Sequence, residues 1–140
     1  MSPLWTQLLI ALVAVPLFAA LHGVGLMIVT YGFNLRDERL QRKQFTWASH
    51  FLLALIGFSL FLVHAVEIAV FAAFYQAVGA IPDFERALFV SGSFYTTVGA
   101  SEASLPDAWK LMGTLEALLG LLLVGWSTAY LVQKINKLKE

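Results

Sequence analysis

The run Thr96-Thr97-Val98-Gly99-Ala100-Ser101-Glu102 decides how the rest of this sequence is interpreted. It is a short polar stretch between two apolar segments, and the preceding residues 87–95 predict a short helix. In a membrane protein, this order fits a half-length helix that enters from one side and a chain that returns to the same side as extended backbone. Irregular backbone is tolerated at membrane depth only where it is buried in protein or lines a water-filled path. The run therefore predicts a re-entrant loop beside such a path.

The composition places the whole chain in the membrane. Of its 140 residues, 59% are hydrophobic and 13% are charged, whereas about a quarter are charged in an ordinary globular domain. The mean hydropathy is +0.77. The formal net charge is zero, so no basic field suggests a nucleic-acid partner. The absence of cysteine excludes disulfides, thiolate metal sites and cysteine nucleophiles. We expect an all-α membrane protein without a second domain.

Three apolar segments are long enough to cross a bilayer, which takes about 20 residues. They are residues 4–33, 47–78 and 111–132. The first has a competing interpretation as a signal peptide, since Phe18-Ala19-Ala20 resembles a cleavage site. A signal peptide begins with basic residues, however, and residues 1–7 contain no Lys or Arg. We expect a retained span.

The distribution of basic residues predicts the orientation of these spans. Seven of the nine fall in the first connector or after the last span, and three spans put both regions on one side: Arg36, Arg39, Arg42, Lys43, Lys134, Lys137 and Lys139. Basic residues favour the cytoplasmic side. We therefore expect the N-terminus and the re-entrant loop outside and the C-terminus in the cytoplasm. The expected location is a plasma membrane, specifically a bacterial inner membrane.

The polar run resembles the potassium-channel signature T-T-V-G-Y-G-D. Ala100 replaces the tyrosine, Ser101 the second glycine and Glu102 the aspartate. The order of spanning helix, short helix, motif and spanning helix over residues 51–132 also fits this family. The competing interpretation is that the match is a structural coincidence. The resemblance implies a two-span pore module with one re-entrant loop. It also implies that carbonyls of Thr97 and Val98 bind K⁺ or Na⁺, and that four copies close a homotetrameric ring.

On this resemblance, the chain divides into an extra helix, a connector, a pore module and a tail. The extra transmembrane helix is 1–34, the basic cytoplasmic connector is 35–46, the pore module is 47–133, and the cytoplasmic tail is 134–140. Within the module we expect an outer helix over 47–78, a pore helix over 84–96, a filter over 97–101 and an inner helix over 110–133.

The departures from the signature predict a weakened filter. A residue with a side chain adopts the backbone geometry of the second glycine only at a cost, and this place is taken by Ser101. Ala100 cannot brace the outer filter as the family's tyrosine does, and Val90 stands where the bonding aromatic of the pore helix is expected. The inner ion sites, formed by Thr97, Val98 and Gly99, are retained. We therefore expect a monovalent cation pore that passes K⁺ and also Na⁺.

Ionisable residues at membrane depth are costly and are usually paired or functional. His64 and Glu67 lie three residues apart and share one face of a helix. Their simplest interpretation is a polar pair at the outer end, and one histidine with one carboxylate falls far short of a metal site. Together with Arg86 and Glu116, we expect them to form a network that braces the filter.

The histidine spacing leaves a second interpretation open. His50 and His64 are 14 residues apart, a spacing that stacks two b-type haems. Such haems need matching histidines on a second helix, and only His22 is available. This alternative is an electron-transfer subunit.

Other candidate residues concern gating and the outer mouth. Gly120 and Gly125 serve either as a hinge of the gate or, as is commoner for small residues in spans, in close helix packing. Glu102 and Asp107 predict an outer mouth that attracts cations. The sequence shows neither an arginine ladder nor a soluble ligand-binding domain, so it does not indicate what opens the pore.

The expected function is passive conduction of monovalent cations by a homotetramer in a lipid bilayer. We expect no enzymatic activity, and no cofactor other than the permeant K⁺ or Na⁺. The alternative is a channel-shaped protein that does not conduct and is regulated by a partner.

Overall fold

The computed structural model describes residues 3–35, 47–99 and 105–139. This part of the chain is helical. The helices are α1 (Pro3–Gly32), α3 (Trp47–Ala77), α4 (Phe84–Tyr95), the 3₁₀ turn η2 (Asp107–Trp109) and α5 (Lys110–Lys139).

Three of these helices are long and apolar enough to cross a membrane. The qualifying stretches are Leu4–Gly32, Trp47–Ala77 and Asp107–Lys137. In their most apolar windows, no more than 28% of the residues are buried within the chain. A helix that is apolar on the sides facing away from its own protein is suited to lipid or to a neighbouring subunit, not to water. The chain is a multi-pass membrane protein.

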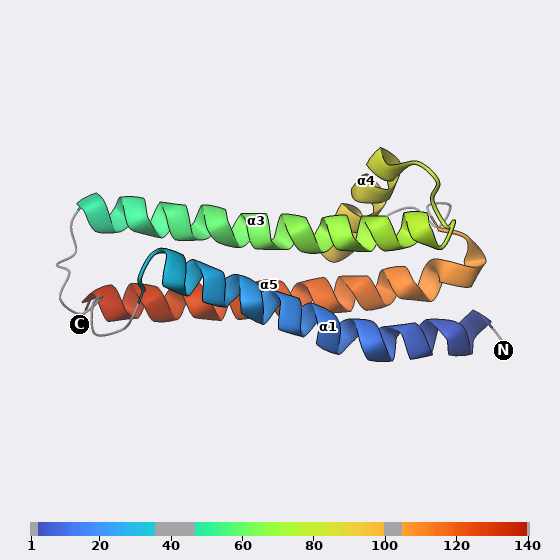
Figure 1. The fold of residues 1–140 in the computed structure, drawn as a ribbon, viewed down its shortest axis with the longest axis horizontal. Coiled ribbons are helices and arrows are strands. Elements are labelled where there is room, and N and C mark those ends of the chain that lie inside the picture. The colour runs from blue at the N-terminus through green and yellow to red at the C-terminus, as the bar shows by residue number, and fades with distance from the viewer. Residues whose placement is uncertain (1–2, 36–46, 100–104, 140) are drawn as a thin grey trace.

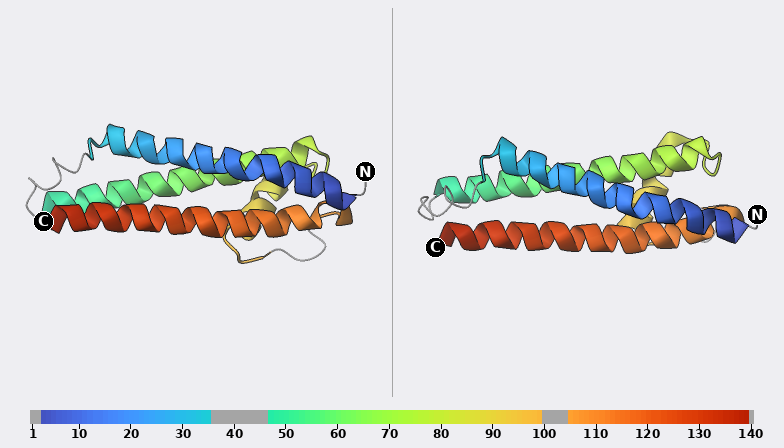
Figure 2. Two further views of the ribbon diagram at one scale, coloured as in Figure 1. Left: turned by 90° about the horizontal axis from the view of Figure 1, so that it is seen from below. Right: turned by 60° about the horizontal axis from the view of Figure 1, so that its bottom comes forward.

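The long helices form an elongated bundle in which α3 runs antiparallel to α1 and α5 (Figure 1). The N-terminus and α4 lie at one end of this bundle, and the C-terminus lies at the other. The views of Figure 2 show α1 crossing the bundle obliquely, while α4 is inclined to the long helices. Helix α4 contacts α3 and α5, and α1 contacts the same two helices. Both α4 and α1 therefore pack against the same two helices, α3 and α5.

Helix α4 begins with a side-chain cap, Asp83. The Asp83 side chain accepts a hydrogen bond of 2.7 Å from the backbone amide of Arg86, which satisfies one of the amides that a helix leaves unpaired at its start. Glu85 lies in the first turn, where the helix dipole favours an anion. The buried face of α4 consists of Ala87, Val90, Ser91 and Tyr95.

Helix α5 is longer than the sequence suggested. It continues through residues 134–139, which we expected to be a separate tail, because residues 126–139 contain no glycine or proline to end it. Lys134 on this extension is buried and donates to the carbonyl of Leu35, 3.2 Å away. The final helical turns therefore pack against the end of the segment that follows α1.

Candidate functional site

The motif Thr96-Thr97-Val98-Gly99 lies directly after α4. We expected extended backbone here, but these residues form a tight turn. The Thr97 amide donates to the Phe94 carbonyl at 2.8 Å, and the Gly99 amide donates to the Ser93 carbonyl at 2.9 Å. Thr97 and Gly99 have positive φ angles of 61° and 82°. The physical reason is that the last carbonyls of α4 lack partners within the helix, and the turn supplies amides to them.

The residues of this turn are exposed on the single chain. Val98 keeps 81% of its surface accessible although its side chain is apolar. Of the remaining predicted filter and mouth residues, Ala100, Ser101 and Glu102 lie outside the described residues. Asp107 is exposed and forms an ion pair of 2.9 Å with Lys110.

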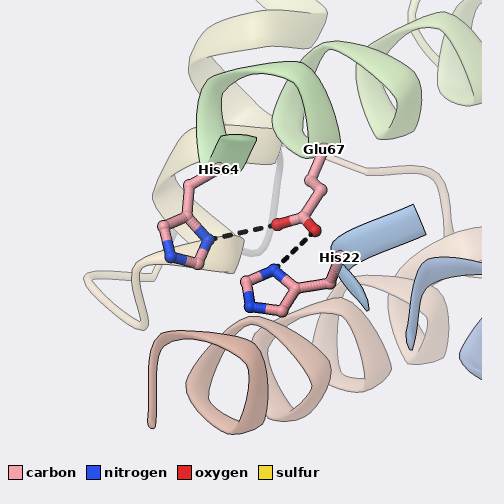
Figure 3. A group of neighbouring side chains, drawn as sticks. All are labelled: His22, His64 and Glu67. Atoms are coloured by element: carbon pink, nitrogen blue, oxygen red, sulfur yellow. Dashed lines mark hydrogen bonds and ion pairs between the residues drawn. The ribbon is translucent and has the colours of Figure 1, made fainter. Parts of the chain in front are cut away.

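The carboxylate of Glu67 is fully buried at the centre of a polar cluster. Its Oε1 lies 2.9 Å from Nδ1 of His22, and its Oε2 lies 3.1 Å from Nδ1 of His64. Figure 3 shows the two rings approaching the carboxylate from different helices, α1 and α3. The hydroxyl of Tyr95 donates to Oε2 at 2.5 Å. Because Tyr95 is the residue before Thr96, this cluster holds the inner end of the motif in place.

A second buried carboxylate, Glu116 on α5, forms a separate network. Ser91 donates to its Oε1 at 2.5 Å, and Tyr75 donates to its Oε2 at 2.7 Å. All three residues are fully buried. Among the described residues, Glu116 therefore joins α3, α4 and α5 through two hydroxyl groups.

Both networks attach to the same side of α4. Ser91 and Tyr95 are four residues apart, and residues at this spacing are neighbours on one helical face. Ser91 is bound to the carboxylate on α5, and Tyr95 is bound to the carboxylate on α3. The two acids thus hold the short helix between its two neighbours.

The sequence-predicted bracing residues are only partly brought together. His64 and Glu67 contact each other, whereas Glu116 belongs to the second network. Arg86 takes part in neither, because it lies at the exposed start of α4, where its backbone amide is capped. The partners that sequence reasoning missed are hydroxyls and one imidazole rather than an arginine: His22, Tyr75, Ser91, Tyr95 and Ser127.

The glycine candidates on α5 differ in their surroundings. A Cβ at Gly120 would lie 2.2 Å from the backbone oxygen of Tyr95, whereas a Cβ at Gly125 would meet no atom within 4 Å. Gly120 therefore permits the close approach of α5 to the end of α4. Only Gly125 is left as a hinge candidate without a packing role in the described residues.

The histidines are not arranged for two stacked haems. The rings of His22 and His64 lie side by side, with centroids 5.2 Å apart. Both Nε2 atoms are near the Ser127 hydroxyl, at 3.3 Å from His22 and 3.0 Å from His64, and both Nδ1 atoms face Glu67. His50 is exposed and packs on Trp47 near the start of α3. The nitrogens that a haem iron would need are engaged within the cluster.

Comparison with known proteins gives one match. A family model described as "Ion channel" matches residues 61–137, more than half of the chain. The matched region contains the second half of α3, all of α4 and most of α5, whereas α1 lies before it. No curated protein and no solved structure matches the chain.

Proposed function

The chain belongs to the two-span, potassium-channel-like ion channel family, and we propose that it is a homotetrameric pore for monovalent cations. In this proposal α4 is a re-entrant pore helix and the residues after it line the ion path. The observation that carries the proposal is the position of T-T-V-G at the end of a short helix that two spans hold in place.

The exposure of the motif supports assembly around an axis. Thr96, Thr97, Val98 and Gly99 are all exposed on the single chain, and irregular backbone at membrane depth must face protein or water. Four copies arranged in a ring would satisfy this requirement, because each loop would meet its neighbours and a central water-filled path. In such a ring, the carbonyls of Thr97 and Val98 would face the axis.

The direction of the helices supports the orientation proposed for the pore. Helix α4 has 12 residues, or roughly 18 Å, too few to cross the hydrocarbon core. It lies at the same end of the bundle as the N-terminus (Figure 1). We place this end outside and the C-terminus in the cytoplasm, in agreement with the positive-inside rule. The negative end of the α4 dipole would then favour cations in the central cavity.

The proposed pore discriminates weakly between K⁺ and Na⁺. The inner sites are assigned to Thr97 and Val98, and Ala100 and Ser101 replace the residues that build the outer sites in the family. The number and field strength of the carbonyl sites, or their fit to the ion, determine selectivity in such filters. Fewer ordered sites would therefore admit both ions.

Flux into liposomes that contain the purified tetramer tests this proposal. We expect uptake with K⁺ and with Na⁺ as the only permeant cation, and none in liposomes without protein. Gly99→Ala should reduce uptake, because φ of 82° disfavours a residue with a Cβ. Gly79→Ala is the matched control, since Gly79 also has a positive φ and open surroundings but lies in the turn before α4. A correctly assembled wild type without flux would instead support the partner-regulated, non-conducting alternative.

A further inference from the structure

A third metal-ligating side chain joins the pair that the sequence indicated. His22, on α1, lies beside His64 and Glu67 on α3 (Figure 3), and the ligand atoms of all three lie within 4.8 Å of one another. We propose that these residues bind Zn²⁺ or a similar divalent first-row metal ion. The ion would link α1 to the pore module. This ion is resident in the protein and distinct from the conducted cations.

The chemistry and spacing of the donors suit such an ion. Zinc binds imidazole nitrogen at about 2.0–2.1 Å and carboxylate oxygen at about 2.0–2.2 Å, so that tetrahedral donors lie roughly 3.3 Å apart. Here the Glu67 oxygens lie 2.9 Å from Nδ1 of His22 and 3.1 Å from Nδ1 of His64. Small side-chain movements would therefore make room for the ion. Two imidazoles and one carboxylate favour zinc and its neighbours over calcium or magnesium, which prefer oxygen ligands.

The contacts around Ser127 are compatible with a metal ion on the Nδ1 side of the two rings. The Ser127 hydroxyl lies within hydrogen-bond distance of the Nε2 atom of each ring. With a metal ion on the two Nδ1 atoms, both Nε2–H groups donate to the Ser127 oxygen, which can accept two bonds. This is the outer hydrogen bond that metal-bound histidines usually make.

The Tyr95 oxygen could serve as a fourth donor to the proposed ion, and its hydroxyl proton would be released on binding. The hydroxyl of Tyr95 is 2.5 Å from Oε2 of Glu67 and 2.8 Å from Nδ1 of His64. His22, Glu67 and Tyr95 are almost completely buried, and only 16% of the His64 side chain is exposed. A closed set of four protein ligands is typical of structural zinc rather than of a catalytic site with an open position.

The site would give α1 a specific role. His22 precedes the matched region, which starts at residue 61, whereas the other proposed ligands lie within it. The ion would therefore link the additional helix to Tyr95, the last residue of α4 before the motif. Binding would stabilise the bundle at the inner end of the filter loop.

The metal content of the purified full-length protein tests the inference, and it does so independently of conduction. After incubation with Zn²⁺ and removal of loosely bound metal, we expect about one zinc per chain. His22→Gln and His64→Gln should abolish this stoichiometric binding. Ser127→Ala should weaken zinc affinity by about 10–100-fold without removing a ligand. His50→Gln is the matched control, because His50 is an exposed histidine on α3 outside the cluster, and it should bind zinc as the wild type does.

Cobalt provides a second readout that does not depend on variants that fold poorly. Co²⁺ bound to the wild type should show the intense visible absorption of a four-coordinate ion, and Zn²⁺ should displace it. A wild type that binds no more zinc than His22→Gln would overturn the inference, because the hydrogen bonds of the cluster would then hold it together without an ion. Equal loss in His50→Gln, or only the weak absorption of six-coordinate Co²⁺, would equally overturn it by indicating adventitious binding.

Discussion

The two buried carboxylates perform similar tasks with different partners. Glu67 and Glu116 both accept a hydrogen bond from the inner face of α4, through Tyr95 and Ser91 respectively. The remaining partner of Glu116 is Tyr75, a neutral hydroxyl within the matched region. Glu67 instead faces two imidazoles, one of which lies outside that region.

The same difference distinguishes the matched region from α1, which precedes it. The Glu116 network connects α3, α4 and α5, the three α-helices that the matched region includes wholly or in part. The Glu67 cluster connects the same helices to α1 as well, through His22. We infer that Glu116 positions α4 within the module, whereas Glu67 also makes the module dependent on the N-terminal helix.

The largest expected effect comes from removing each acid in turn. Glu67→Ala removes the carboxylate that two imidazoles and a phenol face in a buried site, and we expect a loss of about 3–5 kcal/mol in the free energy of unfolding. Glu116→Ala removes the acceptor of two hydroxyl groups and should lower the free energy of unfolding by about 1–3 kcal/mol. Denaturation of the purified protein, followed by size-exclusion chromatography, measures both losses.

Glu85→Ala serves as the control for these acids, because Glu85 is exposed in the first turn of α4. It should lose only the helix-dipole contribution of about 0.3–1 kcal/mol. Equal losses in the free energy of unfolding for Glu67→Ala and Glu116→Ala would show that the two imidazoles contribute nothing to stability.

The close approach at Gly120 gives the next largest effect. A methyl group there would lie 2.2 Å from the Tyr95 carbonyl oxygen, so Gly120→Ala must displace backbone and should cost about 1–3 kcal/mol. Gly125→Ala meets no atom within 4 Å and should stabilise the helix by up to about 1 kcal/mol. Thermal unfolding of the two variants compares them, and an equal response at both positions would refute the packing role of Gly120.

Double-mutant cycles sharpen the separation between the networks. Tyr95→Phe and His22→Gln act on the same carboxylate, so we expect their effects to be non-additive by about 0.5–3 kcal/mol. Tyr75→Phe with His22→Gln involves two different carboxylates, and these effects should add within about 0.3–0.5 kcal/mol. Urea unfolding of the single and double variants gives the coupling energies. Strong coupling in the second pair would mean that the two networks act as one.

The smallest effect is expected for the residues that the sequence predicts at the outer mouth. Glu102→Gln should reduce single-channel conductance mainly at low ionic strength, because salt screens the attraction of an exposed charge for cations. Asp107→Asn is the control, since Lys110 already offsets the charge of Asp107 at 2.9 Å, and it should change conductance less. A loss that is the same at high salt would argue against an electrostatic role of Glu102.

The sequence predicted the class of protein and its membrane helices well. The polar run and its order among apolar segments indicated the family, and the comparison confirms it. Three helices that are long and apolar enough to span a membrane are likewise observed, because length and apolarity are properties of the sequence itself. The re-entrant geometry, the tetramer and the ion sites stay predictions, and part of the motif lies outside the described residues.

The partners of the buried acids were harder to predict. Periodicity relates His64 to Glu67 within one helix, but it does not tell which side of α1 packs against them. Helix α1 is apolar all round, so its sequence defines no buried face. One signal was present: residues 4–33 contain no Asp, Glu, Lys or Arg, which singles out His22. A lone histidine in a span usually has a partner, and here it is Glu67.

The most direct test of the central claim is the reversal potential with K⁺ on one side of the membrane and Na⁺ on the other. For the wild type we predict a value close to zero, because a filter with Ala100 and Ser101 retains only its inner sites. Ala100→Tyr combined with Ser101→Gly should shift the potential toward K⁺ selectivity, and each change alone should shift it less. A wild type that already excludes Na⁺ as strongly as an intact T-V-G-Y-G filter would contradict the account.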